Sequence, residues 1–175
     1  MRPTRLITAH DVPALTALVR TNRDFLAPWE PVRNEEYFTE DGQSAVVDAA
    51  LAMHRQEAGL PHVILDEAGR IVGRITLSGV VRGAFQSCCL GYWVAEVDNG
   101  RGHATAAVRD ITRVAFEDWV LHRVQAEILH HNLGSRRVLE RTGFAWYGTA
   151  PEYLNIAGSW QDFDLYQVLD GVRAV

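Results

Sequence analysis

Residues 91–108, GYWVAEVDNGRGHATAAV, decide the fold of this chain. The first of them form an apolar strand pattern, and those after Gly102 bring small and apolar side chains to one side at helical spacing. The turn between them, from Gly100 to Gly102, would collect unpaired backbone N–H groups at the positive end of the helix dipole, where a phosphate can bind. An ordinary strand-to-helix turn is the alternative interpretation.

Three phosphate-binding motifs contain glycine-rich turns, and the neighbouring residues separate them. A P-loop needs Lys and then Ser or Thr after its second glycine, which GRGHAT lacks. A dinucleotide-binding fingerprint needs Gly or Ala where Thr105 stands, in an early strand-helix-strand unit, whereas this turn lies in the middle of the chain. The third motif binds the pyrophosphate arm of acetyl-CoA, and it remains open.

The bulk composition is that of a globular protein. The chain has 175 residues, of which 47% are hydrophobic and 22% charged, and we expect residues 1–175 to form a single domain. A net charge of −5 without a basic tract argues against nucleic acid as a partner. No membrane span or signal peptide is expected, so the predicted location is the cytoplasm, as a monomer or a homodimer.

The cysteines and histidines of this sequence do not indicate a disulfide, a nucleophile or a metal site. Cys88 and Cys89 are adjacent in an apolar strand pattern, so they point to opposite faces, and no ordinary disulfide joins them. We expect them to belong to the core rather than to act as nucleophiles. The seven histidines form no HxxxH or Cys/His cluster, so no metal site is predicted.

The periodicity along the chain predicts a mixed α/β domain built around one sheet. We expect strands near residues 5–9, 62–66, 70–80, 87–95, 122–130, 145–150 and 162–169. Helices are expected near residues 11–22, 42–57, 102–119 and 132–143, the last of them stopped by Gly143. Pro28 and Pro31 should break regular structure around Trp29 and Glu30.

Several blocks of sequence resemble the GNAT acetyltransferases, and within them the RimJ/RimL branch. The turn region resembles the branch's strand and G-x-G-x-A-T motif, and HHNLGSRRVLERTGF (130–144) resembles its N-x-x-S segment. NRDFLAPWEPVR (22–33), SGVVRGAF (78–85) and APEYLNIAGSWQDFDLY (150–166) also resemble segments of the branch, and the likeness spans about residues 5–169. Val97 and Ala106 depart from the family pattern without removing a backbone donor.

The resemblance implies the GNAT fold, a mixed and mostly antiparallel sheet flanked by helices, with splayed central strands around residues 88–94 and 123–129. Acetyl-CoA would lie between these strands, and the N–H of Val94 is a candidate donor to the thioester oxygen. The residues implied in binding it are Trp93, Val94, Asn99, Gly100, Arg101, Gly102, His103, Ala104, Asn132 and Ser135.

Two residues are candidates for the chemistry. The resemblance associates Glu152, on a predicted loop, with the general base that takes the proton of the attacking amine. Ser135 would protonate the departing CoA thiolate or hydrogen-bond its sulfur. The alternatives are a solvated loop glutamate for Glu152 and simple helix capping for Asn132 and Ser135.

Trp29, Glu30 and Tyr153 are the candidates for acceptor binding. Trp29 lies between prolines without amphipathic periodicity, so it could form a wall of a peptide cleft, and Glu30 could pair with a cationic N-terminus. The alternative is that Trp29 fills a gap between the N-terminal helices. The resemblance implies acetylation of the N-terminal α-amine of a protein or peptide, such as an alanine of a ribosomal protein. A small amine as acceptor, or a CoA-binding regulatory module without turnover, remains open.

Overall fold

The computed structural model describes residues 2–171. The strands are β1 (Thr4–Leu6), β2 (Leu60–Leu65), β3 (Ile71–Val81), β4 (Ser87–Val94), β5 (Arg123–Leu129), β6 (Ala145–Ile156) and β7 (Ser159–Leu169). The helices are α1 (Val12–Thr21), α2 (Arg23–Leu26), α3 (Glu40–Arg55), α4 (His103–Glu117) and α5 (Leu133–Arg141). Short 3₁₀ turns lie at Ala9–Asp11, Ala27–Trp29, Glu35–Phe38 and Glu96–Asp98.

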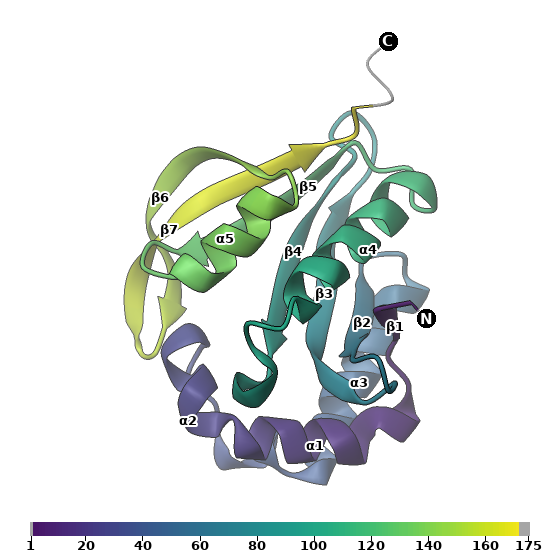
Figure 1. The fold of residues 1–175 in the computed structure, drawn as a ribbon, viewed down its shortest axis with the longest axis vertical. Coiled ribbons are helices and arrows are strands. Elements are labelled where there is room, and N and C mark those ends of the chain that lie inside the picture. Colours follow the sequence, from purple (N-terminus) through teal and green to yellow (C-terminus); the bar gives the residue numbers. More distant parts are fainter. Residues whose placement is uncertain (1, 172–175) are drawn as a thin grey trace.

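The described strands form one sheet with the order β1-β2-β3-β4-β5-β7-β6 (Figure 1). Within the described part of the chain, β4 and β5 run parallel, and every other neighbouring pair is antiparallel. Their parallel pairing joins residues 87–89 to residues 123–125 and then stops, while β4 stays paired with β3 and β5 with β7. The expected mostly antiparallel sheet with splayed central strands is therefore confirmed.

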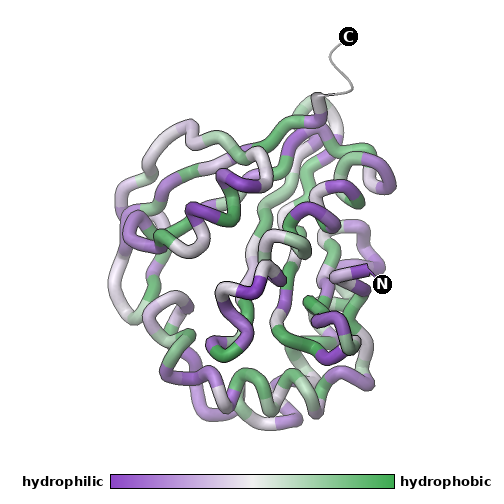
Figure 2. Tube along the Cα trace, in the orientation of Figure 1, coloured by the Kyte–Doolittle hydropathy of each residue, from purple (hydrophilic) through white to green (hydrophobic). Residues whose placement is uncertain are grey.

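The helices α4 and α5 lie on the same face of the sheet (Figure 1). Five buried side chains of α4 recur at helical spacing: Ala107, Val108, Ile111, Val114 and Ala115. They share one core with Ile75 and Leu77 of β3 and with Leu139 of α5. Figure 2 shows that hydrophobic residues concentrate along the central strands, whereas β6 is mostly white to purple.

The helices α1 and α3 cover the opposite face. Leu15 of α1 and Val47 of α3 pack against Val63 of β2 in a second, smaller core. The start of α3 is capped by Thr39, whose side chain accepts the N–H of Gly42 at 3.0 Å. These two helical layers leave the splayed ends of β4 and β5 between them.

The N-terminal elements differ in detail from the sequence prediction. The first strand ends at Leu6 rather than near residue 9, because the following residues form a 3₁₀ turn in which Asp11 accepts the N–H of Thr8 at 2.8 Å. The segment around Trp29 is also more regular than expected, since Pro28 occupies an early position of a 3₁₀ turn, where its missing N–H is not needed.

The C-terminal hairpin is longer than predicted. β6 and β7 extend to a tight turn at Ala157 and Gly158, where φ is +51° and +85°. The pairing of β6 with β7 is irregular between Ala150 and Leu154. Glu152 therefore lies inside β6, not on a loop, and the prediction for its local structure was wrong because a bulged strand carries the same Pro and Asn signals as a turn.

We predict that Ile111→Ala destabilises the protein because Ile111 is fully buried in the core under α4. The substitution should lower the free energy of unfolding by about 2–5 kcal/mol and the melting temperature by roughly 5–15 °C. Thermal unfolding followed by circular dichroism measures this. Val97→Ala is the control, since Val97 is 70% exposed, and an equal shift in both variants would contradict this packing.

Candidate functional site

A cavity of about 470 Å³ lies where β4 and β5 separate. Two stretches of strand line it from the centre of the sheet, residues 90–93 of β4 and residues 126–129 of β5. The remaining walls come from the segment around α2, from β3, from α5 and from the β6–β7 hairpin. A smaller cavity of about 300 Å³ adjoins it and shares Leu26, Glu30, Arg33 and Tyr37 with it.

Side chains from both faces of the sheet line this cavity. Successive side chains of a strand point to opposite faces. Ala126 and Ile128 of β5 belong to the core under α4, so Glu127 between them points to the face covered by α1 and α3. Leu129 lies on that same face and packs with Ile156 and Phe163. The cavity therefore connects the two sides of the sheet.

The glycine turn before α4 has the geometry of an anion site. The φ angles of Gly100 and Gly102 are +74° and +87°, in the left-handed region that favours glycine. A Cβ atom added at either residue would meet no protein atom within 4 Å, so the space beside the turn is open. Within the described chain, the backbone N–H groups of residues 100–105 donate to no protein acceptor. These are the free donors that phosphate binding needs.

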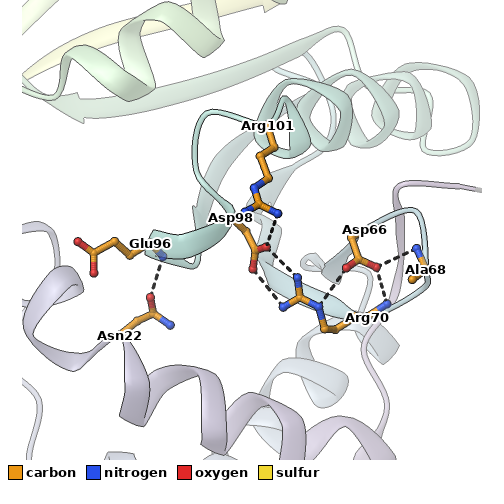
Figure 3. Close-up of polar contacts among 7 residues, drawn as sticks. All are labelled: Asn22, Asp66, Ala68, Arg70, Glu96, Asp98 and Arg101. Carbon is orange, nitrogen blue, oxygen red and sulfur yellow. Dashed lines mark hydrogen bonds and ion pairs between the residues drawn. The ribbon is translucent and has the colours of Figure 1, made fainter.

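A buried carboxylate holds this turn in place (Figure 3). The side chain of Asp98 is 2% exposed and accepts two hydrogen bonds from Arg70, at 2.8 and 3.2 Å. These bonds lower the pKa of Asp98, so it stays ionised at neutral pH. Arg101 lies 3.9 Å from the same carboxylate, and its own side chain is exposed.

A second contact fixes the turn to α1. Asn22, at the end of α1, accepts the backbone N–H of Glu96 at 2.8 Å through its amide oxygen (Figure 3). Its amide nitrogen donates to the carbonyl of Leu18 at 2.9 Å. The residue that ends α1 therefore positions the 3₁₀ turn that leads to Gly100.

Asn132 and Ser135 both line the cavity at the start of α5. The side-chain oxygen of Asn132 accepts the N–H of Ser135 at 3.0 Å, so the capping role considered from the sequence is present. Its amide nitrogen remains available for a ligand. The hydroxyl of Ser135 lies 2.7 Å from the hydroxyl of Tyr92, whose pKa is raised to about 12 by burial.

The acceptor-binding candidates are only partly brought together. Trp29 and Glu30 line the cavity, as does the cofactor-binding candidate Trp93, but Tyr153 does not belong to its lining. The ring of Trp29 lies 5.5 Å from that of His131 and packs on the core of β5, β6 and β7. Trp29 therefore forms a wall beside these strands rather than filling a gap between the N-terminal helices.

Val94, Glu152 and the candidates at residues 99–104 also lie outside the cavity lining. Val94 is buried in the core under α4, so any role in the site belongs to its backbone. Glu152 is exposed on β6, with φ at +47°, and its N–H donates to Asp162 at 2.8 Å. Such strain at a non-glycine residue is often found at functional positions. Leu154, two residues further on, does line the cavity.

Three groups of the cavity were missed by the sequence reasoning, namely Arg74, Tyr92 and Glu127. Glu127 lines it, and burial raises the pKa of its carboxyl, an effect opposed by a hydrogen bond to the Cys89 thiol. Tyr92 supports Ser135. All three lie in strands whose apolar pattern predicts only core. Tyr92 belongs to the GYWV strand of the quoted motif, which assigned it no role, and no motif distinguishes Arg74 or Glu127.

The cysteines are both free thiols, as expected. Burial raises the pKa of Cys88 to about 12 and that of Cys89 to about 11, so neither is a ready nucleophile. Among residues 2–171, no group of His, Cys, Asp and Glu side chains is arranged to hold a metal ion. No helix in that range is long and apolar enough to cross a membrane.

Comparisons with known proteins agree on one family. Residues 4–145 match the family described as acetyltransferase (GNAT) domain. The chain is 35% identical over 163 residues to the ribosomal protein uS5-alanine N-acetyltransferase of Escherichia coli (strain K12), which covers 90% of this chain and 82% of that protein. It is 33% identical over 150 residues to the probable N-acetyltransferase YjcK of Bacillus subtilis (strain 168), covering 85% and 83%.

A solved structure matches nearly the whole chain. Mycobacterium smegmatis RimJ, in complex with CoA-disulfide, superposes with a TM-score of 0.92 at 30% sequence identity. The match covers 98% of this chain and 83% of that one. The splayed sheet is therefore shared with a protein whose structure contains CoA.

Proposed function

This chain belongs to the GNAT acetyltransferases, and we propose that it transfers an acetyl group from acetyl-CoA to the N-terminal α-amine of a protein or peptide. The observation that carries the proposal is the cavity at the separation of β4 and β5, which side chains from both faces of the sheet line. A donor can enter such a cavity from one face and an acceptor from the other.

The donor side lies under α4 and α5. The free N–H groups of residues 100–105 would bind the pyrophosphate of acetyl-CoA, beside the open space at Gly100 and Gly102. In this proposal the pyrophosphate would also lie next to the other residues of the turn, Asn99, Arg101, His103 and Ala104. The amide nitrogen of Asn132 would donate to the peptide-like pantetheine arm, because its oxygen already caps α5.

Acetyl-CoA supplies a thioester whose carbonyl carbon the amine attacks while the carbon–sulfur bond breaks. The N–H of Val94 is the proposed donor to the carbonyl oxygen, on which charge develops during attack. The hydroxyl of Ser135 is proposed to protonate the departing sulfur, and Tyr92, 2.7 Å away, orients that hydroxyl. Direct attack fits the two cysteines, whose raised pKa values leave them protonated.

The amine must be deprotonated before or during its attack. A peptide α-amine has a pKa of about 7.7–8.0, so a modest base is sufficient. We assign this role to Glu152, as the resemblance implies, and its strained backbone beside the cavity is consistent with a functional position. We place the amine beside Glu127, which lines the cavity itself and is therefore the competing base.

The acceptor side lies toward α1, α2 and the β6–β7 hairpin. Trp29 would form a wall of the channel, Glu30 would attract a cationic N-terminus, and Tyr153 would border it near Phe163, whose ring lies 5.7 Å away. The adjoining cavity of about 300 Å³ supports an extended acceptor over a small amine. A relative named for the alanine of uS5 supports a ribosomal protein as the class of acceptor, which would place the activity in the cytoplasm.

We expect the purified protein to acetylate short peptides that begin with Ala, Ser, Met or Gly faster than a panel of small amines, including polyamines and aminoglycosides. The extended cavity is the physical reason, since a small amine fills only part of it. Release of free CoA, followed continuously, measures both rates. Turnover confined to small amines would contradict the proposal that the acceptor is a protein N-terminus. CoA binding without any turnover would indicate a regulatory module.

Gly102→Ala should weaken the binding of CoA. Its methyl group would occupy the open space beside the N–H groups and strain a residue with φ at +87°, so we expect the Kd to rise about tenfold. Isothermal titration calorimetry with CoA measures this. Gly83→Ala is the matched control, because Gly83 has φ at +70° and equally open surroundings outside the site. A similar loss of CoA affinity in both variants would refute the phosphate site.

Glu152→Gln should lower kcat at least about 100-fold with an unchanged Kd for CoA, because the amide cannot accept the proton of the amine. Glu127→Gln is the comparison variant, and we expect it chiefly to raise the KM for the acceptor. Steady-state kinetics with one good peptide measures both. The reverse pattern, with kcat lost only in Glu127→Gln, would transfer the base role to Glu127.

A further inference from the structure

Arg74 is a cation without a partner in the wall of the cavity. It lies on β3 and lines the cavity together with Thr76, Tyr92 and Trp93. Within residues 2–171, its guanidinium has no hydrogen-bond partner and no carboxylate within 4.0 Å, and only the longer-range charges of Tyr37 and Glu30 favour its charged form. Burial lowers its pKa from the ordinary value, while its side chain still borders the open cavity. A half-buried guanidinium without a protein partner can bind an anionic group of a ligand that enters the cavity.

The position of Arg74 assigns it to the acceptor side. Residues directly opposite each other in an antiparallel pair share a face, and Arg74 stands opposite Val63 of β2. Val63 packs under α1 and α3, whereas the glycine turn begins α4 on the opposite face. Arg74 therefore lies across the sheet from the helix that would bind the CoA pyrophosphate.

Nearby charges do not already satisfy Arg74. Of the described carboxylates, Glu30 is the one whose charge raises the pKa of Arg74. It forms an ion pair with Arg33 at 3.3 Å. Arg33 in turn stacks over the ring of Tyr37, 4.5 Å from its centroid. This arrangement leaves Glu30 and Arg33 as a pair and Arg74 as the excess positive charge of that wall.

We propose that Arg74 determines acceptor specificity by binding a carboxylate side chain of the acceptor, so that the enzyme selects N-termini with an acidic residue among their first four positions. This inference rests on the proposed N-terminal acetylation. A guanidinium and a carboxylate form paired, charge-assisted hydrogen bonds, which a neutral side chain cannot replace.

The spacing of the strands sets the length of the acceptor. Arg74 lies on β3 and Glu127 on β5, with β4 between them. Neighbouring strands are about 4.8 Å apart, so their backbones stand roughly 10 Å apart before the splay adds to this. An extended peptide advances about 3.3 Å per residue, so an amine beside Glu127 would bring its third or fourth residue near Arg74. A free amino acid, with both groups on one carbon, cannot span this distance.

The test compares hexapeptides that begin with Ala and carry Glu, Gln or Lys at positions three and four. With the wild-type protein we expect kcat/KM to be about tenfold higher for the Glu peptide than for the Gln peptide, mainly through KM. Arg74→Gln should bring this ratio close to one while preserving activity on the Gln peptide. Arg74→Glu should reverse the preference in favour of the Lys peptide.

Three controls separate this effect from a general loss of charge or structure. Arg55→Gln removes the same charge from the exposed end of α3 and should keep the tenfold ratio. The Kd for CoA should be the same in Arg74→Gln and in the wild type, and a raised value would contradict the acceptor-side position. Arg74→Lys retains the charge and should retain part of the preference for the Glu peptide. The comparison of peptides with the wild-type protein is independent of any effect that a substitution has on folding.

Three outcomes would overturn the inference. One is a wild-type ratio near one, and another is a preference that survives Arg74→Gln. The third is faster acetylation of free glutamate than of any peptide, lost in Arg74→Gln, which would assign Arg74 to a small zwitterion. Acetylation of a small amine but of none of the peptides is a separate result, because it overturns the proposed function on which the inference rests.

Discussion

The parallel pairing of β4 with β5 joins residues 87–89 to residues 123–125 and goes no further. Two parallel neighbours need a crossover, and here α4 provides it. Because α4 follows β4 and α5 follows β5, both helices begin at the ends where their strands have separated. Asn132 and Ser135 at the capped start of α5 therefore line the cavity, and the unpaired N–H groups at the start of α4 lie beyond its lining, where β4 has separated from β5.

The separation of the strands also divides the chemistry between two faces. The face under α4 and α5 offers backbone donors, an amide and hydroxyl groups, which suit a ligand common to a whole family. The opposite face offers charged and aromatic side chains from β3, β5 and the segment around α2. Backbone donors remain in place when the side chains change, so they can bind the same ligand in many proteins. A substitution of a side chain changes which acceptor can bind beside it. Specificity for the acceptor is therefore expected on the second face.

The sequence predicted the architecture well because its signals are local. Helical spacing in α4, the alternating strands and the glycine turn each depend on a few neighbouring residues. The order of elements and the splay were confirmed, and so were the free cysteines. The errors arose where local signals were ambiguous. Glu152 stands among residues that favour a turn, yet pairing with β7 draws this segment into a bulged strand.

The polar residues of the cavity could not be read from the sequence for a different reason. Arg74 and Glu127 occupy alternate positions of two strands, where a polar residue ordinarily faces solvent. Their surroundings depend on α3, the segment around α2 and the β6–β7 hairpin, which come from distant parts of the chain. An apolar residue at either position would be more favourable for folding, because it would avoid desolvating a charge. Arg74 and Glu127 are nevertheless charged, and both lie in the wall of a cavity that must admit an amine. Binding of the acceptor explains these charges better than a contribution to the stability of the fold.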